Sequence, residues 1–424
     1  MSAFHAWRAS TFAAASLPDY RRLLYTLTLT FFALWMVGLA RGFIVYDLTG
    51  SSAALGGVFI AFGVPQLIFG LVGGVVADRL PRRQLVVAGQ LWFALEYVLL
   101  GALLATGRLE YWMIIVASVI EGASLAFYIP ARTAMIGDLV PATSLGNAMA
   151  LQQVAFNAAR IIGPLLAGWL IAVPAIGAGG SLILAGLIFL ASALLVLTLP
   201  KVPSRGVRSG GSPLSQVAGG IEYVRRRPAL VILVLTSYTV ATLAFPYIAF
   251  LPALVKDVYG MGSVALGAMN SAVALGALVA AVLCAMVIDG GSAWRWQAIA
   301  STGFVVVLMA FAVAPAFPIA LVIGALLGAG EIGFISLNQG LSMRFADPTY
   351  HGRVQSLLMM GFAFFGIVAF PMGYLADAIG IRETLFIEGA AATAILALIL
   401  VYARISNAAE DARLPSTPAS APAD

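Results

Sequence analysis

Runs of about 20 apolar residues recur along the whole chain, and each matches the hydrocarbon thickness that a membrane-spanning α-helix must cross. Only 10% of the 424 residues are charged and 62% are hydrophobic, so the chain lacks the polar surface of a soluble protein of this length. The strands of a membrane barrel would appear as short alternating segments instead of long apolar runs. The sequence therefore predicts an all-α membrane protein.

Polar segments between the runs divide the chain into twelve predicted transmembrane helices, arranged as two six-helix bundles. The expected spans are residues 23–46, 53–76, 84–106, 111–132, 147–173, 180–199, 229–254, 264–288, 296–314, 317–340, 354–379 and 384–403. The expected units are a first bundle at 1–199, a cytoplasmic linker with a short amphipathic piece at 200–228, a second bundle at 229–404 and a disordered tail at 405–424.

Basic residues are divided unevenly between the two sides of the predicted bundle. Eighteen of the 23 Lys and Arg residues fall on the side that holds both termini, and only Arg41, Arg108, Lys256 and Arg382 fall on the other. Because cytoplasmic loops of membrane proteins are enriched in Lys and Arg, we expect both termini in the cytoplasm and the chain in the inner membrane. The net charge of +5 then reflects orientation in the bilayer, and we expect no nucleic-acid partner.

The two halves of the chain share a weak internal repeat. Residues 46–57, YDLTGSSAALGG, resemble residues 256–268, KDVYGMGSVALGA. The alignment pairs Asp47 with Asp257, Gly50 with Gly260 and Gly56 with Gly267. Repeated halves of this kind normally enclose a central cavity and rock against each other.

A cluster of charge follows the second predicted span, where residues 74–83 read GVVADRLPRR. This stretch resembles the signature loop of the major facilitator superfamily, although Pro81 stands where that signature usually has Gly. The motif YDLTGSSAALG, the NAMALQQVAFNAARIIGPLLAG of span 5 and the HGRVQSL before span 11 resemble its transmembrane secretion effector branch, which includes exporters of siderophores and macrolides. The resemblance implies two pseudo-symmetric six-helix bundles and alternating access, usually powered by protons.

The resemblance also implies that the charged loop latches a cytoplasmic gate. The expected gating residues are Asp78, Arg79, Arg82, Arg83 and, at the end of span 4, Arg132. A carboxylate at this depth is favoured by a nearby Arg and by the N-terminus of a helix. The alternative for the arginines is that they only set the orientation of the chain.

Four ionisable residues deep inside predicted spans are the candidates: Glu96, Glu121, Arg160 and Glu331. A charge at the bilayer centre costs about 2.5–3.5 kcal/mol on insertion scales, which makes each a functional candidate. Spans 4 and 5 are antiparallel neighbours, so we expect Glu121 and Arg160 to pair, either as a structural bridge or for coupling. Glu331, with no basic residue in its own span, is the favoured proton carrier, and Glu96 is the second choice. For both, the alternative is a protonated acid hydrogen-bonded to a neighbouring helix.

Polar and aromatic side chains at helical spacing are expected to line the central cavity. They are Gln153, Asn157, Asn338, Tyr128, Tyr238 and Trp35. In span 5, the GPLLAG stretch with Gly163 and Pro164 resembles the Gly-Pro element of antiporters, and it predicts a close helix approach and a bend. The alternative is a kink without a role in transport.

Several functional classes lack their sequence signatures. The chain has no phosphate-cradling glycine loop, no nucleophile elbow and no cluster of metal ligands, so we expect neither an enzyme nor a cofactor or metal site. The expected function is a monomeric, proton-coupled exporter of a small amphipathic molecule such as a drug, siderophore or secondary metabolite. An importer of a metabolite or siderophore, a lysophospholipid flippase and a non-transporting sensor remain open.

Overall fold

The computed structural model describes residues 13–200, 213–287 and 292–406; within these, the side chains of 71–75, 77–79, 213–218 and 362–363 are not described. All regular structure in the described residues is helical. The elements are η1 (Ala14–Ser16), α2 (Pro18–Thr49), α3 (Ser52–Arg79), α4 (Arg82–Ala105), α5 (Tyr111–Leu139), η2 (Ala142–Ser144), α6 (Leu145–Ala172), α7 (Gly177–Val196), α8 (Pro213–Arg225), α9 (Pro228–Leu243), α10 (Tyr247–Ala253), η3 (Leu254–Val258), α11 (Ser263–Val287), α12 (Ala293–Ala312), α13 (Phe317–Phe345), η4 (Pro348–Tyr350), α14 (His351–Ile379) and α15 (Ile381–Ile405).

Twelve segments of the described chain are long and apolar enough to cross a membrane, which confirms the predicted number. The seventh predicted span, expected as one helix over 229–254, is instead broken into α9, α10 and the π-helical segment η3. The break lies at residues 244–246, where Pro246 has no N–H to continue the helical ladder. Tyr247, the first residue of α10 after this break, is fully buried.

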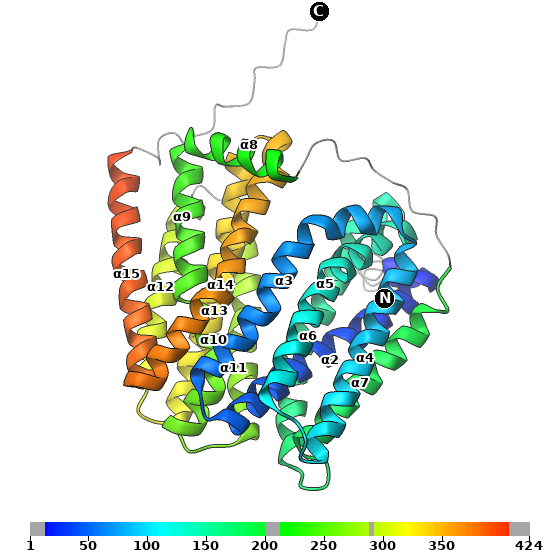
Figure 1. Ribbon diagram of the computed structural model, residues 1–424. Coiled ribbons are helices and arrows are strands. Elements are labelled where there is room, and N and C mark those ends of the chain that lie inside the picture. Colours follow the sequence, from blue (N-terminus) through cyan, green and yellow to red (C-terminus); the bar gives the residue numbers. More distant parts are fainter. Residues whose placement is uncertain (1–12, 201–212, 288–291, 407–424) are drawn as a thin grey trace, which may run out of the picture.

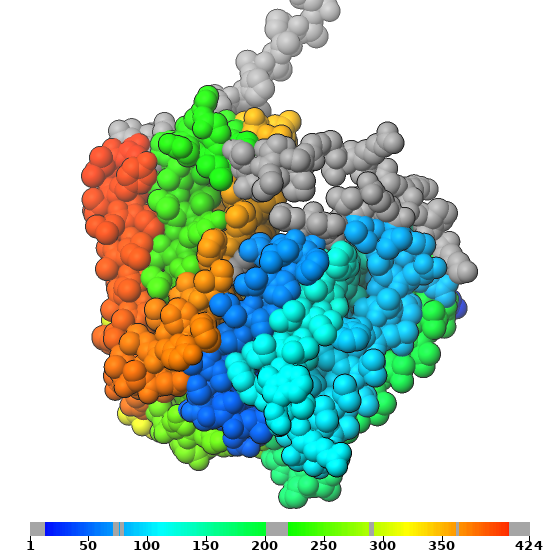
Figure 2. Space-filling view, in the orientation of Figure 1, coloured from blue at the N-terminus to red at the C-terminus, as the bar shows by residue number. Residues whose placement is uncertain are grey.

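The helices form two bundles, α2 to α7 and α9 to α15 (Figure 1). The bundles meet along two seams, where α3 packs on α14 and α6 packs on α11. In the space-filling view the blue surface of α3 and the orange surface of α14 touch low in the picture (Figure 2). The repeat is visible in the backbone, because Gly50 and Gly260 both end a helical segment with a left-handed φ, of 60° and 64°. Only glycine adopts this conformation without strain.

Contacts between the bundles gather at one end of the helices. Five inter-bundle contacts leave no room for a Cβ atom, because backbone of the other bundle occupies its place: Gly56 against Ala369, Gly373 against Ser52, Gly366 against Phe59, Gly168 against Ser263 and Gly267 against Pro164. All lie toward the start of α3 and the end of α6, on the side opposite the termini, which we call the far side. The other side, where α2 begins and α15 ends, is the termini side. The ribbons of the two bundles diverge toward it (Figure 1).

Helix α8, in the predicted linker, lies on the termini side against the second bundle (Figure 1). The ring of Tyr223 stacks on Tyr350 with 3.9 Å between centroids, and its hydroxyl donates to Asp347 at 2.9 Å. Arg227 pairs with the same carboxylate at 2.8 Å. The amphipathic piece is therefore a surface helix of the second bundle. Within the predicted linker and tail, residues 201–212 and 407–424 lie outside the described residues.

Candidate functional site

A cavity of about 410 Å³ lies between the two bundles, surrounded by α2, α3, α5, α6, α10 and α11. Aromatic side chains form much of its wall: Trp35, Phe59, Phe62 and Phe156. The polar side chains that reach it are Arg41, Glu121 and Asn270. A mostly apolar pocket with a few convergent polar groups is typical of a small-molecule binding site.

Arg41 of α2 and Glu121 of α5 form an ion pair at the wall of this cavity. The Tyr97 hydroxyl also donates to Glu121, at 2.5 Å. The carboxylate is almost fully buried, and these partners offset the cost of desolvating it. Nε and Nη2 of Arg41 have no hydrogen-bond partner within the described residues, so they remain available to a ligand.

Arg41 lies inside the predicted first span, 23–46, although the sequence counts it only among the basic residues of the far side. Helix α2 continues to Thr49, so Arg41 lies two turns inside the helix and its side chain is only 18% exposed. A count of basic residues by side does not separate a residue within a helix from one in a loop.

A second ion pair joins the bundles directly. Arg160 Nη2 of α6 lies 2.7 Å from Glu331 Oε1 of α13, and the Tyr247 hydroxyl donates to Glu331 Oε2 at 2.8 Å. The Arg160 guanidinium also lies 5.6 Å from the ring centroid of Trp35, at the cavity. The predicted pair between Glu121 and Arg160 is therefore wrong, because each residue is paired with a distant helix instead of its neighbour in sequence.

Of the six predicted polar and aromatic cavity residues, only Trp35 lines the described cavity. The other five lie outside its lining. Tyr128 is buried inside the first bundle, against the ring of Phe93 at 5.7 Å. Asn338 is buried inside the second bundle and accepts a hydrogen bond from Gln297 at 3.2 Å. Both are core residues in this conformation.

Three further predicted positions lie on α6 and α9. Gln153 is exposed and Asn157 half-buried on α6, toward its termini-side end. Tyr238 of α9 packs beside Phe364 of α14, with 5.9 Å between ring centroids. Their role in binding stays a prediction, as does that of Glu96, which is buried in α4 and has no ion pair within the described residues.

The Gly-Pro element of α6 lies at two helix contacts. A Cβ atom at Gly163 would come within 2.9 Å of Trp35 Cβ, so this glycine lets α2 and α6 approach closely. Pro164 lines the cavity, and its carbonyl faces Gly267 across the seam. Helix α6 continues through the proline to Ala172, and a bend during transport stays a prediction.

The predicted gate lies on the termini side. Asp78 and Arg79 end α3, but their side chains lie outside the description. Arg82 Nη1 lies 2.7 Å from both oxygens of Asp138, and Arg83 donates to backbone carbonyls at the end of α7. Arg132 lies over the ring of Phe31, 5.1 Å from its centroid. These contacts of the three arginines are made within their own bundle, and the latch stays a prediction.

A set of contacts that the sequence analysis missed closes the far side. Lys256 pairs with Asp47 at 2.8 Å, and the Tyr46 hydroxyl donates to Asp257. The repeat aligns position 46 with 256 and position 47 with 257. Between the bundles, position 46 contacts 257 and position 47 contacts 256, so the two contacts are equivalent under the repeat. We call these two contacts the reciprocal pairs. The repeat was a usable signal, because both copies begin with a polar side chain, Tyr46 or Lys256, followed by an aspartate.

Asp377 of α14 adds a third far-side contact. Its carboxylate accepts hydrogen bonds from Ser51 Oγ at 2.6 Å, from the backbone N–H of Ser52 at 2.6 Å and from that of Ala53 at 3.1 Å. The first N–H groups of a helix have no partner within the helix, and a carboxylate there is favoured by the helix dipole. One bundle therefore caps a helix of the other.

Two buried polar residues inside the bundles were also missed. Gln90 donates to Thr30 at 3.0 Å and to Ser192 at 2.9 Å, which joins α4, α2 and α7. Glu388 of α15 is 1% exposed, and neither carboxylate oxygen has a partner within the described residues. The criterion of an acid inside an apolar run, which identified the other glutamates, applies to Glu388 as well.

Sequence comparisons agree with this architecture. The family model of the Major Facilitator Superfamily matches residues 23–369. Macrolide efflux protein A of Streptococcus pyogenes is 22% identical over 374 residues, which cover 86% of this chain and 90% of that protein. An uncharacterized MFS-type transporter of Bacillus subtilis, YfiS, is 24% identical over 232 residues; the match covers 53% of this chain and only half of YfiS.

A solved structure supports the fold. The bacterial homologue of the human lysosomal transporter Spinster, in an inward-facing and unoccupied conformation, superposes with a TM-score of 0.70 at 16% identity, over 94% of this chain and 98% of that one. The match of the family model over most of the sequence, together with twelve helices in two related bundles, identifies a membrane transporter and not an enzyme. The chain belongs to the major facilitator superfamily.

Proposed function

We propose that this protein is a proton-coupled exporter of small amphipathic molecules, which works by alternating access. The mostly apolar and aromatic cavity supports this substrate class, because it offers large apolar faces and only a few polar groups. The full-length similarity to a macrolide efflux protein supports export.

We further propose that the termini side is cytoplasmic, because it holds most of the basic residues. The two moving units are then 1–199 and 229–404. The far side becomes the extracellular side, where the reciprocal pairs and the cap by Asp377 join the bundles. Substrate enters this conformation from the cytoplasm or from the inner leaflet of the membrane.

The observation that carries the coupling proposal is the ion pair between Arg160 and Glu331. It joins the two bundles beside the cavity, so its formation and loss are linked to their relative position. A proton on Glu331 removes the charge that holds Arg160. Glu331 therefore cannot carry a proton and hold Arg160 in an ion pair at the same time. A proton that Glu331 takes up in one conformation and releases in the other drives the exchange between the two conformations.

The test is transport of radiolabelled erythromycin and of ethidium into everted membrane vesicles energised with a proton gradient. Wild-type protein should accumulate at least one of these compounds, and Glu331→Gln should lower accumulation to background while binding to purified protein remains measurable. Glu388→Gln is the matched control, because Glu388 is equally buried in the second bundle but has no described partner in the first. It should keep transport.

Full proton-driven accumulation by Glu331→Gln contradicts the coupling proposal. Equal loss in both variants contradicts the assignment to Glu331, because it would reflect a general sensitivity to loss of a buried acid. Movement of the compounds out of everted vesicles, with no increased drug sensitivity in a deletion strain, would indicate an importer.

A further inference from the structure

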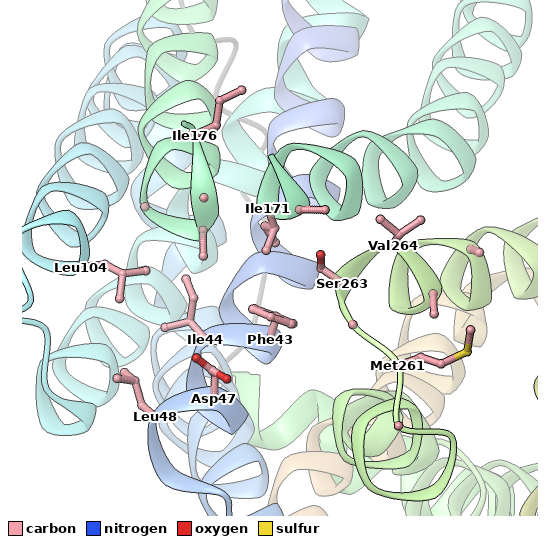
Figure 3. A pocket seen from close by; sticks show the side chains of 18 of the residues that line it. Phe43, Ile44, Asp47, Leu48, Leu104, Ile171, Ile176, Met261, Ser263 and Val264 are labelled. Atoms are coloured by element: carbon pink, nitrogen blue, oxygen red, sulfur yellow. The ribbon is translucent and has the colours of Figure 1, made fainter. Parts of the chain in front are cut away.

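A second cavity, larger than the central one, is a groove of about 1010 Å³ on the far side (Figure 3). Phe43, Ile44 and Asp47 of α2 lie across from Met261, just before α11, and from Ser263, its first residue; Ile171 of α6 also lines the groove (Figure 3). The groove therefore belongs to both bundles and lies at the α6–α11 seam.

Between the groove and the central cavity lies a small void of about 10 Å³, which we call the constriction. The constriction shares Pro252 and Leu266 with the central cavity, and it shares Phe43, Met261 and Gly262 with the groove. The three spaces therefore lie next to one another, in the order central cavity, constriction and groove. The other seam also has a groove, of about 680 Å³ between α3, α5 and α14, but it shares no lining residue with the central cavity.

The reciprocal pairs are located at this constriction. Tyr46 and Lys256 line it, and their partners are Asp257 and Asp47. Separation of the bundles on the far side breaks both contacts and widens the constriction. It also frees the carboxylate of Asp47, which already faces the groove.

The lining indicates which kind of molecule the groove accepts. Its walls are mostly aliphatic and aromatic, and Asp47 is the one ionisable residue among the described residues that line it. The Ser263 hydroxyl is already used, because it donates to the Gly168 carbonyl at 2.9 Å. An apolar molecule with a protonated amine complements such a site, since the amine can replace Lys256 at Asp47.

We propose that this groove is the exit site of the transporter, where a cationic amphipathic substrate binds after it passes between Phe43 and Met261. This inference rests on the proposed export function. The substrate moves along α2 and α11, leaves the polar groups of the central cavity and places its amine on Asp47 before it reaches the outside.

The first experiment fills the groove with bulk. Ala268→Trp places an indole in the groove, and Ala54→Trp is the matched control, because Ala54 is an equally half-buried alanine in the groove of the other seam. Ala268→Trp should slow erythromycin or ethidium transport by about tenfold or more without weakening binding from the cytoplasmic side, as expected for bulk forced into a required passage. Ala54→Trp should transport normally.

A second variant keeps the test valid if the indole prevents folding. The chain has a single cysteine, so Ala268→Cys in a Cys284→Ser background can be made bulky after folding with external benzyl methanethiosulfonate. The reagent should inhibit Ala268→Cys and leave Ala54→Cys active.

The second experiment detects occupancy without transport. A dodecyl ammonium amphiphile carrying a diazirine should label residues 43–48 and 261–268 of purified protein, and Ala268→Trp, unlike Ala54→Trp, should suppress this labelling. Absence of labelling in these segments overturns the exit site, and so does normal transport by Ala268→Trp and by the modified Ala268→Cys. If wild-type protein transports neither compound yet is labelled there, the export proposal fails while the binding site stands.

Discussion

Gly168→Ala is the substitution with the most sharply defined structural effect. The added Cβ atom would overlap the backbone carbonyl of Ser263 across the α6–α11 seam. A flexible side chain could move away, but a backbone oxygen at the start of a helix cannot. The overlap is relieved only if the two bundles separate there, so the substitution should favour the conformation that is open on the far side.

The magnitude follows from the cost of overpacking. Insertion of a methyl group into filled space costs about 1–3 kcal/mol, which shifts a two-state equilibrium by about 5- to 150-fold. Alanine also stabilises a helix relative to glycine by about 1 kcal/mol, but this gain is present in both conformations and cancels. Gly63→Ala is the control, because no atom lies within 4 Å of its Cβ position.

The assay measures the distance between spin labels at Ile176 and Met261, which flank this seam and are 37% and 41% exposed. Both are introduced as cysteines in a Cys284→Ser background. Gly168→Ala should move a large share of the distance distribution to longer values. If folded Gly168→Ala gives the same distribution as Gly63→Ala, the seam does not control far-side opening and the reasoning is refuted.

Two further predictions use the polar contacts. Asp377→Ala removes the cap of α3, which is worth about 0.5–2 kcal/mol, so the same spin-label equilibrium should shift toward opening by about 2- to 30-fold. Asp19→Ala, on the termini side, should have no effect on this equilibrium, and equal shifts in the two variants would contradict the role of the cap. Gln90→Leu removes the amide that donates to the buried hydroxyls of Thr30 and Ser192, so the free energy of unfolding in detergent should fall by about 1–3 kcal/mol. Gln153→Leu, at an exposed position, should change this free energy little.

The number of spans could be predicted from sequence because it depends on local properties. The length of an apolar run and the cost of a charge within it are read without knowing the fold. The same cost argument identified Glu121, Arg160 and Glu331, which the structure places in ion pairs next to the cavity.

The partners could not be predicted, because they depend on the tilt and rotation of helices far apart in sequence. Arg41 lies 80 positions before its partner Glu121, and Arg160 lies 171 positions before Glu331. Helical spacing likewise shows which side chains share a polar face of a helix, but it does not show which neighbouring helix that face contacts. Tyr128 illustrates this, because its face turns into its own bundle and not into the cavity.

The reciprocal pairs have a consequence for the ancestry and design of the chain. In each bundle, an aromatic or basic residue precedes an acid, and the two copies bind reciprocally, because each residue contacts the other position of the opposite copy. A surface of this kind is self-complementary, as in the isologous interface of a twofold homodimer. Two copies of the second bundle would thus meet through two identical Lys256–Asp257 contacts. A far-side contact can therefore be redesigned in one half only if its counterpart in the other half changes with it.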